Sequence, residues 1–214
     1  MDYAKIISAA ARDMRPSGIR KFFDIAAEMK DCISLGVGEP DFKTPWTVRD
    51  AGIRSLELGR TKYTANSGLK ELRGEICNYL QRRFDLHYKE ENILVTVGGS
   101  EAIDGCLRAL VSPGDEVIII APYWVTYPEL VKMASGKPVI VEAREEDDFQ
   151  PRIEAIAQAV TPHTRAIVVN NPSNPCGNVY SRDTLAAIAE LARQHDLVII
   201  SDEIYDVLCY AGEM

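Results

Sequence analysis

From residue 93 onward, short apolar runs alternate with segments whose apolar positions recur at helical spacing. The apolar runs cover residues 93–97, 116–121, 138–141, 166–170 and 197–201. Helical periodicity covers residues 100–111, 127–134, 152–160 and 181–195. Apolar strands separated by amphipathic helices are typical of a mostly parallel sheet with helices on both faces. The pattern therefore predicts an α/β fold.

The residues before this alternation follow a different pattern. They predict a short helix at 18–29, a short strand at 33–37 and longer helices at 45–58 and 69–84. No low-complexity linker separates this region from the alternating one. We interpret it as an arm that packs against a further domain or a partner subunit.

Composition and charge narrow the function classes. The formal net charge of −8 and the lack of a Lys/Arg run argue against nucleic-acid binding. The N-terminus has no signal-peptide core, and the apolar runs are too short to cross a membrane. Five cysteines without a Cys-x-x-Cys pair indicate reduced thiols in the cytoplasm. With only three histidines and no such cysteine pair, the sequence also argues against a metal site.

A glycine pair stands where the first apolar run meets a helix. Gly98 and Gly99 are followed by Ser100 and Glu101. Glycine lets the backbone approach an anion, and a helix N-terminus supplies unpaired N–H groups and a positive dipole end. The amides of Gly99, Ser100 and Glu101 are therefore candidates for holding a phosphate, although a Gly-Gly pair before a helix is by itself more often only a tight turn.

Polar and aromatic residues follow three of the apolar runs. Trp124 follows 116–121, Asn174 follows 166–170, and Asp202 and Tyr205 follow 197–201. Ligands of parallel α/β sheets bind at the carboxyl ends of the strands, so these side chains are candidates for a shared site. Read singly, each has a simpler structural role as a cap, a turn or a packing residue. A cis peptide bond before Pro175 would be one way to aim Asn174.

The segment Asn174-Pro175-Cys176-Gly177 and the pair Asp202 and Tyr205 resemble the Asn-Pro-x-Gly and Asp-x-x-Tyr motifs of class I/II aminotransferases. These are pyridoxal-phosphate (PLP) enzymes of fold type I. Six such segments occur between residues 35 and 205 in the order of the family, and the bacterial aspartate/prephenate branch looks most similar. Cys176 departs from the threonine that the family usually has. The resemblance implies the large PLP-binding domain of that fold.

The resemblance also implies a role for each candidate residue. Asp202 would pair with the protonated pyridine nitrogen of PLP, and Trp124 would stack on its ring. Tyr205 and Asn174 would hydrogen-bond the oxygen on the ring, and Asn174 and Trp124 would also face the substrate. The phosphate would lie on the amides of Gly99, Ser100 and Glu101.

Two further residues match family segments upstream. Gly38, within the run Gly38-Glu39-Pro40-Asp41, would lie near the substrate carboxylate. Tyr63, within Lys62-Tyr63-Thr64, would reach the cofactor phosphate of a neighbouring subunit. The resemblance thus implies a homodimer with shared sites.

The catalytic lysine of the family has no counterpart here. The last lysine is Lys137, whereas the Schiff-base lysine of the family follows the Asp-x-x-Tyr motif and would lie beyond Met214. We therefore expect residues 1–44 to be an arm and the start of a small domain, and 45–214 to be an incomplete large domain, ending before the sheet is complete. The 214 residues alone are expected to be inactive.

The implied reaction transfers an amino group between an L-amino acid, such as aspartate, and a 2-oxo acid in the cytoplasm. A β-lyase or an aminocyclopropane-carboxylate synthase would use most of the same residues. A truncated module that binds without catalysis is the other alternative, and the absence of a late lysine favours it.

Overall fold

The structure is a computed structural model that describes residues 6–12, 14, 25, 28–29, 33, 38 and 42–210. The chain divides into two compact units, residues 1–17 with 97–214, and residues 18–96. We describe each unit by itself. The helix predicted at 18–29 and the strand predicted at 33–37 lie almost entirely outside the described residues. The division expected near residue 44 stays a prediction.

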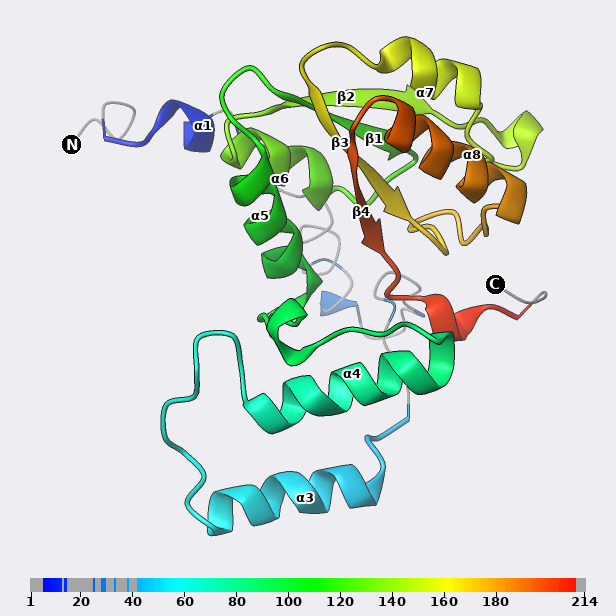
Figure 1. Cartoon of the computed structure of the whole chain (residues 1–214). Coiled ribbons are helices and arrows are strands. Elements are labelled where there is room, and N and C mark those ends of the chain that lie inside the picture. The colour runs from blue at the N-terminus through cyan, green and yellow to red at the C-terminus, as the bar shows by residue number, and fades with distance from the viewer. Residues whose placement is uncertain are drawn as a thin grey trace. The chain divides into compact units, whose positions relative to one another are not determined.

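The first unit contains a parallel sheet of four strands (Figure 1). The strands are β1 (Glu116–Ala121), β2 (Lys137–Glu142), β3 (Thr164–Asn170) and β4 (Val198–Asp202). Their spatial order is β2-β1-β3-β4, and every neighbouring pair is parallel. This confirms four of the five predicted strands and the α/β class.

Helices cover both faces of the sheet, as the alternation predicted (Figure 1). They are α5 (Gly98–Leu110), α6 (Thr126–Met133), α7 (Ile153–Ala159) and α8 (Arg182–Gln194). Val117 and Ile119 of β1 point into a core shared with α5 and α6. Ile118 and Ile120, which alternate with them, point into a core shared with α7 and α8. Both faces of β1 are therefore buried, which explains its uninterrupted apolar sequence. Short helices α1 (Ala9–Arg12), η3 (Glu145–Asp147) and η4 (Asp206–Leu208) complete this unit.

The strand predicted at 93–97 is wrong. Residues 93–96 form no strand, and Val97 lies in a bend directly before α5. A strand needs a neighbour to take its backbone hydrogen bonds, and no described strand pairs with this segment. Leu94 and Val97 are 65% and 90% exposed, so their apolar side chains lack the burial that the pattern suggested.

The second unit contains the predicted helices α3 (Trp46–Glu57) and α4 (Lys70–Phe84), followed by η2 (Glu90–Asn92). Arg73 of α4 donates a hydrogen bond from Nη1 to the carbonyl oxygen of Glu90 at 2.9 Å. Neither long helix buries a residue. Local periodicity was sufficient to predict their bounds within a residue or two.

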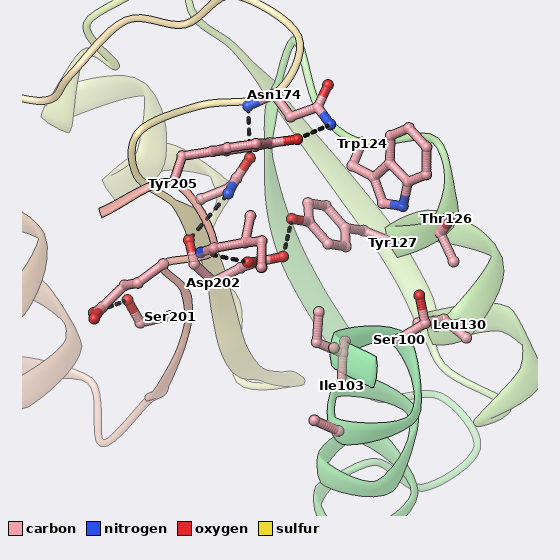
Figure 2. Close-up of a pocket in the computed structure, with 15 residues that line it drawn as sticks. Ser100, Ile103, Trp124, Thr126, Tyr127, Leu130, Asn174, Ser201, Asp202 and Tyr205 are labelled. Atoms are coloured by element: carbon pink, nitrogen blue, oxygen red, sulfur yellow. Dashed lines mark hydrogen bonds between the residues drawn. The ribbon is translucent and has the colours of Figure 1, made fainter. Parts of the chain in front are cut away.

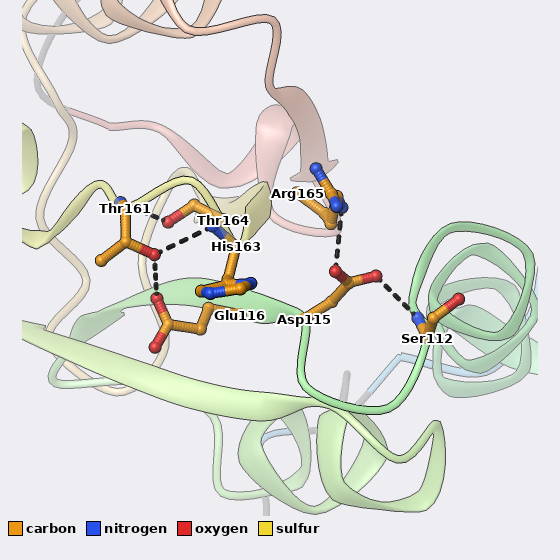
Figure 3. Close-up of polar contacts among 7 residues, drawn as sticks. All are labelled: Ser112, Asp115, Glu116, Thr161, His163, Thr164 and Arg165. Atoms are coloured by element: carbon orange, nitrogen blue, oxygen red, sulfur yellow. Dashed lines mark hydrogen bonds and ion pairs between the residues drawn. The ribbon is translucent and has the colours of Figure 1, made fainter.

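A polar cluster joins the amino ends of β1, β2 and β3. Figure 3 shows its contacts around Asp115 and Glu116, without the contact to β2. Glu116 of β1 accepts hydrogen bonds from Lys137 Nζ of β2 at 2.8 Å and from Thr161 Oγ1 at 2.7 Å. Next to it, Asp115 accepts from Arg165 Nε of β3 at 3.0 Å. The hydrogen bond from Lys137, followed by that from Thr161, lowers the pKa of Glu116 below its ordinary value. The cluster lies at the sheet edge opposite the candidate site.

Candidate active site

An open pocket of about 430 Å³ lies at the carboxyl ends of β3 and β4, beside the starts of α5 and α6 (Figure 2). Its lining residues are Gly99, Ser100, Ala102, Ile103, Trp124, Thr126, Tyr127, Leu130, Asn170, Asn174, Ser201, Asp202, Glu203, Ile204 and Tyr205. Six of the eight residues predicted to bind the cofactor line this pocket. They come from four separate segments that the sheet brings together.

Asp202, the last residue of β4, is held by a residue that the sequence reasoning missed. Tyr127 donates a hydrogen bond from its hydroxyl to Asp202 Oδ2 at 2.6 Å (Figure 2). Asp202 Oδ1 accepts a weaker bond from the backbone N–H of Ile204 at 3.3 Å. Burial, and after it the hydrogen bond to Asp202, raise the pKa of Tyr127 far above the ordinary phenol value. Tyr127 therefore stays a neutral donor, and the carboxylate is fixed at the pocket wall.

Asn174 and Tyr205 form a second polar pair on the pocket. Asn174 Nδ2 donates to Tyr205 Oη at 3.2 Å (Figure 2). The bond between Asn174 and Pro175 is cis, as the motif suggested. Trp124 lines the same pocket. An amide, a phenol and an indole thus surround a cavity whose wall also carries Asp202.

Asn170, at the end of β3, connects the two polar pairs. Its Nδ2 donates to the backbone carbonyl of Asp202 at 3.0 Å, and its Oδ1 accepts from the backbone N–H of Asn174 at 2.7 Å. Asn170 is 8% exposed. A polar residue ending an otherwise apolar run was the sequence signal for it. Tyr127 offered a weaker signal, because an aromatic in the first turn of a buried helix is usually a core residue.

The start of α5 forms another part of the pocket. Gly98 has a φ of +81°, which glycine adopts without steric cost, and helix α5 begins there. Gly99 and Ser100 line the pocket, but Glu101 does not. The Glu101 carboxylate instead turns back and accepts a hydrogen bond from the backbone N–H of Val97. Its side chain therefore caps the helix.

Gly38 and Tyr63 belong to the second unit. A Cβ added at Gly38 would meet nothing within 4 Å, so the close approach expected there involves no described residue of this chain. Tyr63 is fully exposed. Their proposed roles toward a substrate and a neighbouring subunit stay predictions.

Two classes of feature are absent from the part of the chain that the structure describes. No group of three or more His, Cys, Asp or Glu side chains there is placed to hold a metal ion. No helix among the same residues is long and apolar enough to span a bilayer.

Comparisons with known proteins agree with the geometry. Residues 30–214 match the model of the family described as aminotransferase class I and II. The chain is 51% identical over 208 residues to "Putative aminotransferase YugH" of Bacillus subtilis, covering 97% of this chain and 54% of that protein. It is 44% identical to a "Probable aspartate/prephenate aminotransferase" of Thermus aquaticus, covering 96% and 55%.

Solved structures give the same result. The aspartate aminotransferase from Thermus thermophilus with maleate matches with a TM-score of 0.93 and 43% identity, covering 97% of this chain and 55% of that one. The chain thus spans about half the length of the curated relatives it matches.

Proposed function

Because the chain belongs to the class I and II aminotransferases, we propose that it forms part of a PLP-dependent enzyme that transfers an amino group between an L-amino acid and a 2-oxo acid. Aspartate or a similar amino acid is the proposed donor, because several similar proteins carry aspartate aminotransferase names. The observation that carries the proposal is the convergence of Asp202, Tyr205, Asn174 and Trp124 on one pocket at the carboxyl edge of the sheet.

The donor set of the pocket fits the pyridine ring of PLP. A carboxylate suits a protonated ring nitrogen, and an amide paired with a phenol suits a ring oxygen. An indole offers a flat face for a ring to stack on. Asp202 would bind the nitrogen, Tyr127 would hold Asp202 in place, Asn174 and Tyr205 would bind the oxygen, and Trp124 would cover one face. When bound, PLP supplies an electron sink for the bonds at the amino acid's α-carbon.

The start of α5 fits the phosphate of the same cofactor. A helix of this length presents backbone N–H groups and a positive dipole end at its N-terminus. We propose that the amides of Gly99, Ser100 and Glu101 bind the phosphate. Ser100 also brings a hydroxyl to the pocket lining. Groups complementary to the ring and to the phosphate of PLP thus line the same pocket.

The catalytic lysine is proposed to come from outside the 214 residues. The described residues that line the pocket include no lysine. Lys132 is paired with Glu129 at 2.7 Å, and Lys137 is paired with Glu116 at the opposite edge of the sheet. The residues that line the pocket would therefore bind and orient the cofactor, whereas a group from another part of the enzyme would transfer the proton at the α-carbon.

A partner subunit and a cytoplasmic location complete the proposal. Exposed Tyr63 is available to reach the phosphate of a second copy, and Gly38 leaves space for a substrate carboxylate. The free thiols of Cys77, Cys106 and Cys176 are consistent with a reducing compartment.

The test is cofactor loading and half-reaction of the protein at its natural length. Purified protein is incubated with PLP, dialysed, and titrated with L-aspartate while the visible absorbance of bound PLP and the 2-oxo acid product are followed. We expect loss of that absorbance with stoichiometric product. Asp202→Asn should lower the rate by about 100-fold or more, because the ring nitrogen loses its charged partner.

The matched control is Asp183→Asn, which changes an exposed carboxylate on α8. It should leave the rate unchanged. A wild-type protein that binds no PLP, or an Asp202→Asn variant as fast as the control, would contradict the proposed function.

A further inference from the structure

The side chain of Asn170 bridges the two loops that carry the proposed ring ligands. Asn170 ends β3 and lies opposite Asp202, the last residue of β4, in the parallel register. Its amide donates to the Asp202 carbonyl at 3.0 Å and accepts from the Asn174 N–H at 2.7 Å. The end of β4 and the loop that carries Asn174 are thereby linked through one buried side chain, which lies 32 residues before Asp202 in the sequence.

The chemistry of the two partners fixes the orientation of the amide. A backbone carbonyl only accepts and a backbone N–H only donates, so the nitrogen of Asn170 must face Asp202 and the oxygen must face Asn174. Aspartate could satisfy only the N–H, and an apolar residue could satisfy neither. The asparagine side chain is short and planar, and its amide both donates and accepts a hydrogen bond, so it can bridge a carbonyl and an N–H.

The rest of the Asn174 loop is held at its base by other residues. Asn171 Oδ1 accepts from the Tyr180 N–H at 2.8 Å, and the Ser173 N–H donates to the Asn178 carbonyl at 3.0 Å. Asn178 Nδ2 in turn donates to the Phe149 carbonyl at 3.1 Å. These contacts close the loop without touching Asp202 or Asn174. Two other contacts reach the end of β4: the Asn171 N–H donates to the Asp202 carbonyl at 3.1 Å, and Asn174 Nδ2 donates to Tyr205 Oη at 3.2 Å. Asn170 is the side chain that hydrogen-bonds both Asp202 and Asn174.

We propose that Asn170 is a positioning residue that makes the ligand for the ring nitrogen and the ligand for the ring oxygen one rigid unit. The proposal rests on the proposed function of the same pocket. Asn170 sets the separation of Asp202 and Asn174 before PLP arrives, so less ordering is required on binding. Without the bridge, the N–H of Asn174 loses its buried partner. The hydrogen bonds from Asn171 N–H to the Asp202 carbonyl and from Asn174 Nδ2 to Tyr205 Oη are then left to hold the loop against the end of β4.

The experiment compares Asn170→Ala, Asn170→Asp and the matched control Asn178→Ala in the protein at its natural length. PLP affinity is measured by titration of the apoprotein, and kcat and KM are measured separately with L-aspartate. We expect Asn170→Ala to weaken PLP binding about tenfold and to lower kcat, which is the effect of one lost buried hydrogen bond. Asn178→Ala removes a side-chain hydrogen bond from the same loop and should leave both quantities within about twofold.

Asn170→Asp keeps the volume and the acceptor, and it should lie between the wild type and Asn170→Ala in PLP affinity. Affinity and kcat equal to the wild type in both Asn170 variants would overturn the proposal. An Asn178→Ala effect as large as that of Asn170→Ala would also overturn it, because the loss of any side-chain hydrogen bond in the loop would then weaken PLP binding to the same extent. If neither Asn170 variant folds while Asn178→Ala does, Asn170 serves the fold rather than the site, and the proposal is likewise wrong. Failure of the wild type to bind PLP would instead contradict the proposed function.

Discussion

At the scale of single residues, the pocket shows how the hydroxyl of a buried tyrosine can hold a carboxylate in place by a hydrogen bond. Tyr127 is 2% exposed, and its hydroxyl donates to Asp202. Because burial raises its pKa, the phenol keeps its proton throughout the neutral and mildly alkaline range. Its role is to hold Asp202 in one orientation, not to exchange a proton with a substrate.

Tyr127→Phe removes only that hydroxyl. The change should lower kcat about 10- to 100-fold, the usual range for a lost hydrogen bond to a charged group, with little effect on KM. Since the phenol does not titrate in the working range, the alkaline limb of the pH-rate profile should stay where it is. Steady-state kinetics of both proteins between pH 6 and about 9.5 check this. An alkaline limb that disappears in the variant would show that Tyr127 itself is ionising.

Glu101 offers a second prediction, because its carboxylate caps α5 where a phosphate is proposed to bind. Glu101→Gln keeps an acceptor for the Val97 N–H but removes the negative charge. We expect PLP and inorganic phosphate to bind about two- to fivefold more tightly, which corresponds to a charge effect of about 0.3–1 kcal/mol at a helix end. Calorimetric titration measures both. Weaker phosphate binding in Glu101→Gln would show that the charge does not oppose the ligand.

At the scale of elements, the carboxyl and amino ends of the strands carry different kinds of side-chain contact. The carboxyl edge carries the pocket, whereas the amino edge carries the ion pairs and hydrogen bonds of Asp115 and Glu116. Lys137 is largely exposed, so solvent screens part of its attraction to Glu116. The cluster still ties β1, β2 and the start of β3 together without touching the site.

Glu116 should make the stability depend on pH in the acid range. Its pKa is lower in the folded protein than in the unfolded chain. Its contribution is therefore fully present above the unfolded pKa of about 4.5 and is lost as the pH falls through the lower folded pKa. Urea denaturation of wild type and Glu116→Gln at several pH values measures this. The difference between them should be largest near neutrality and shrink toward pH ~3; a constant difference would contradict the linkage.

At the scale of the whole molecule, the unit formed by residues 18–96 exposes the residue proposed to contact a second subunit. Tyr63 lies in the unit formed by residues 18–96 and is fully exposed. Apolar residues of the same unit are also exposed, among them Trp46 and Leu56 of α3. Such surface is typical of a region that another chain covers.

Tyr63→Phe tests whether that second subunit reaches the cofactor. We expect a dimer by light scattering in both proteins and about tenfold weaker PLP binding in the variant, because one hydrogen bond to the phosphate is lost. Tyr88→Phe, which changes another exposed tyrosine of the same unit, is the control. Unchanged PLP affinity in Tyr63→Phe would show that Tyr63 does not contact the phosphate.

Most elements of the fold could be predicted from sequence because their signals are local. Helix and strand periodicity placed α3 through α8 and β1 through β4 within about two residues of their ends. The segment 93–97 failed because its apolar pattern resembles a strand, while a strand exists only where a neighbour accepts and donates the backbone hydrogen bonds. Pairing is a long-range property that no window of sequence contains.

The sequence by itself determined the fold class, the family and six of the residues that line the pocket, because short motifs at strand ends carry that information. Only the tertiary structure decided that Tyr127 holds Asp202 from 75 residues away and that Asn170 bridges the end of β4 and the loop that carries Asn174. It also turned the Glu101 side chain away from the pocket lining. Contacts of this kind depend on strand order and register, which bring distant residues within hydrogen-bonding distance only after the sheet has formed.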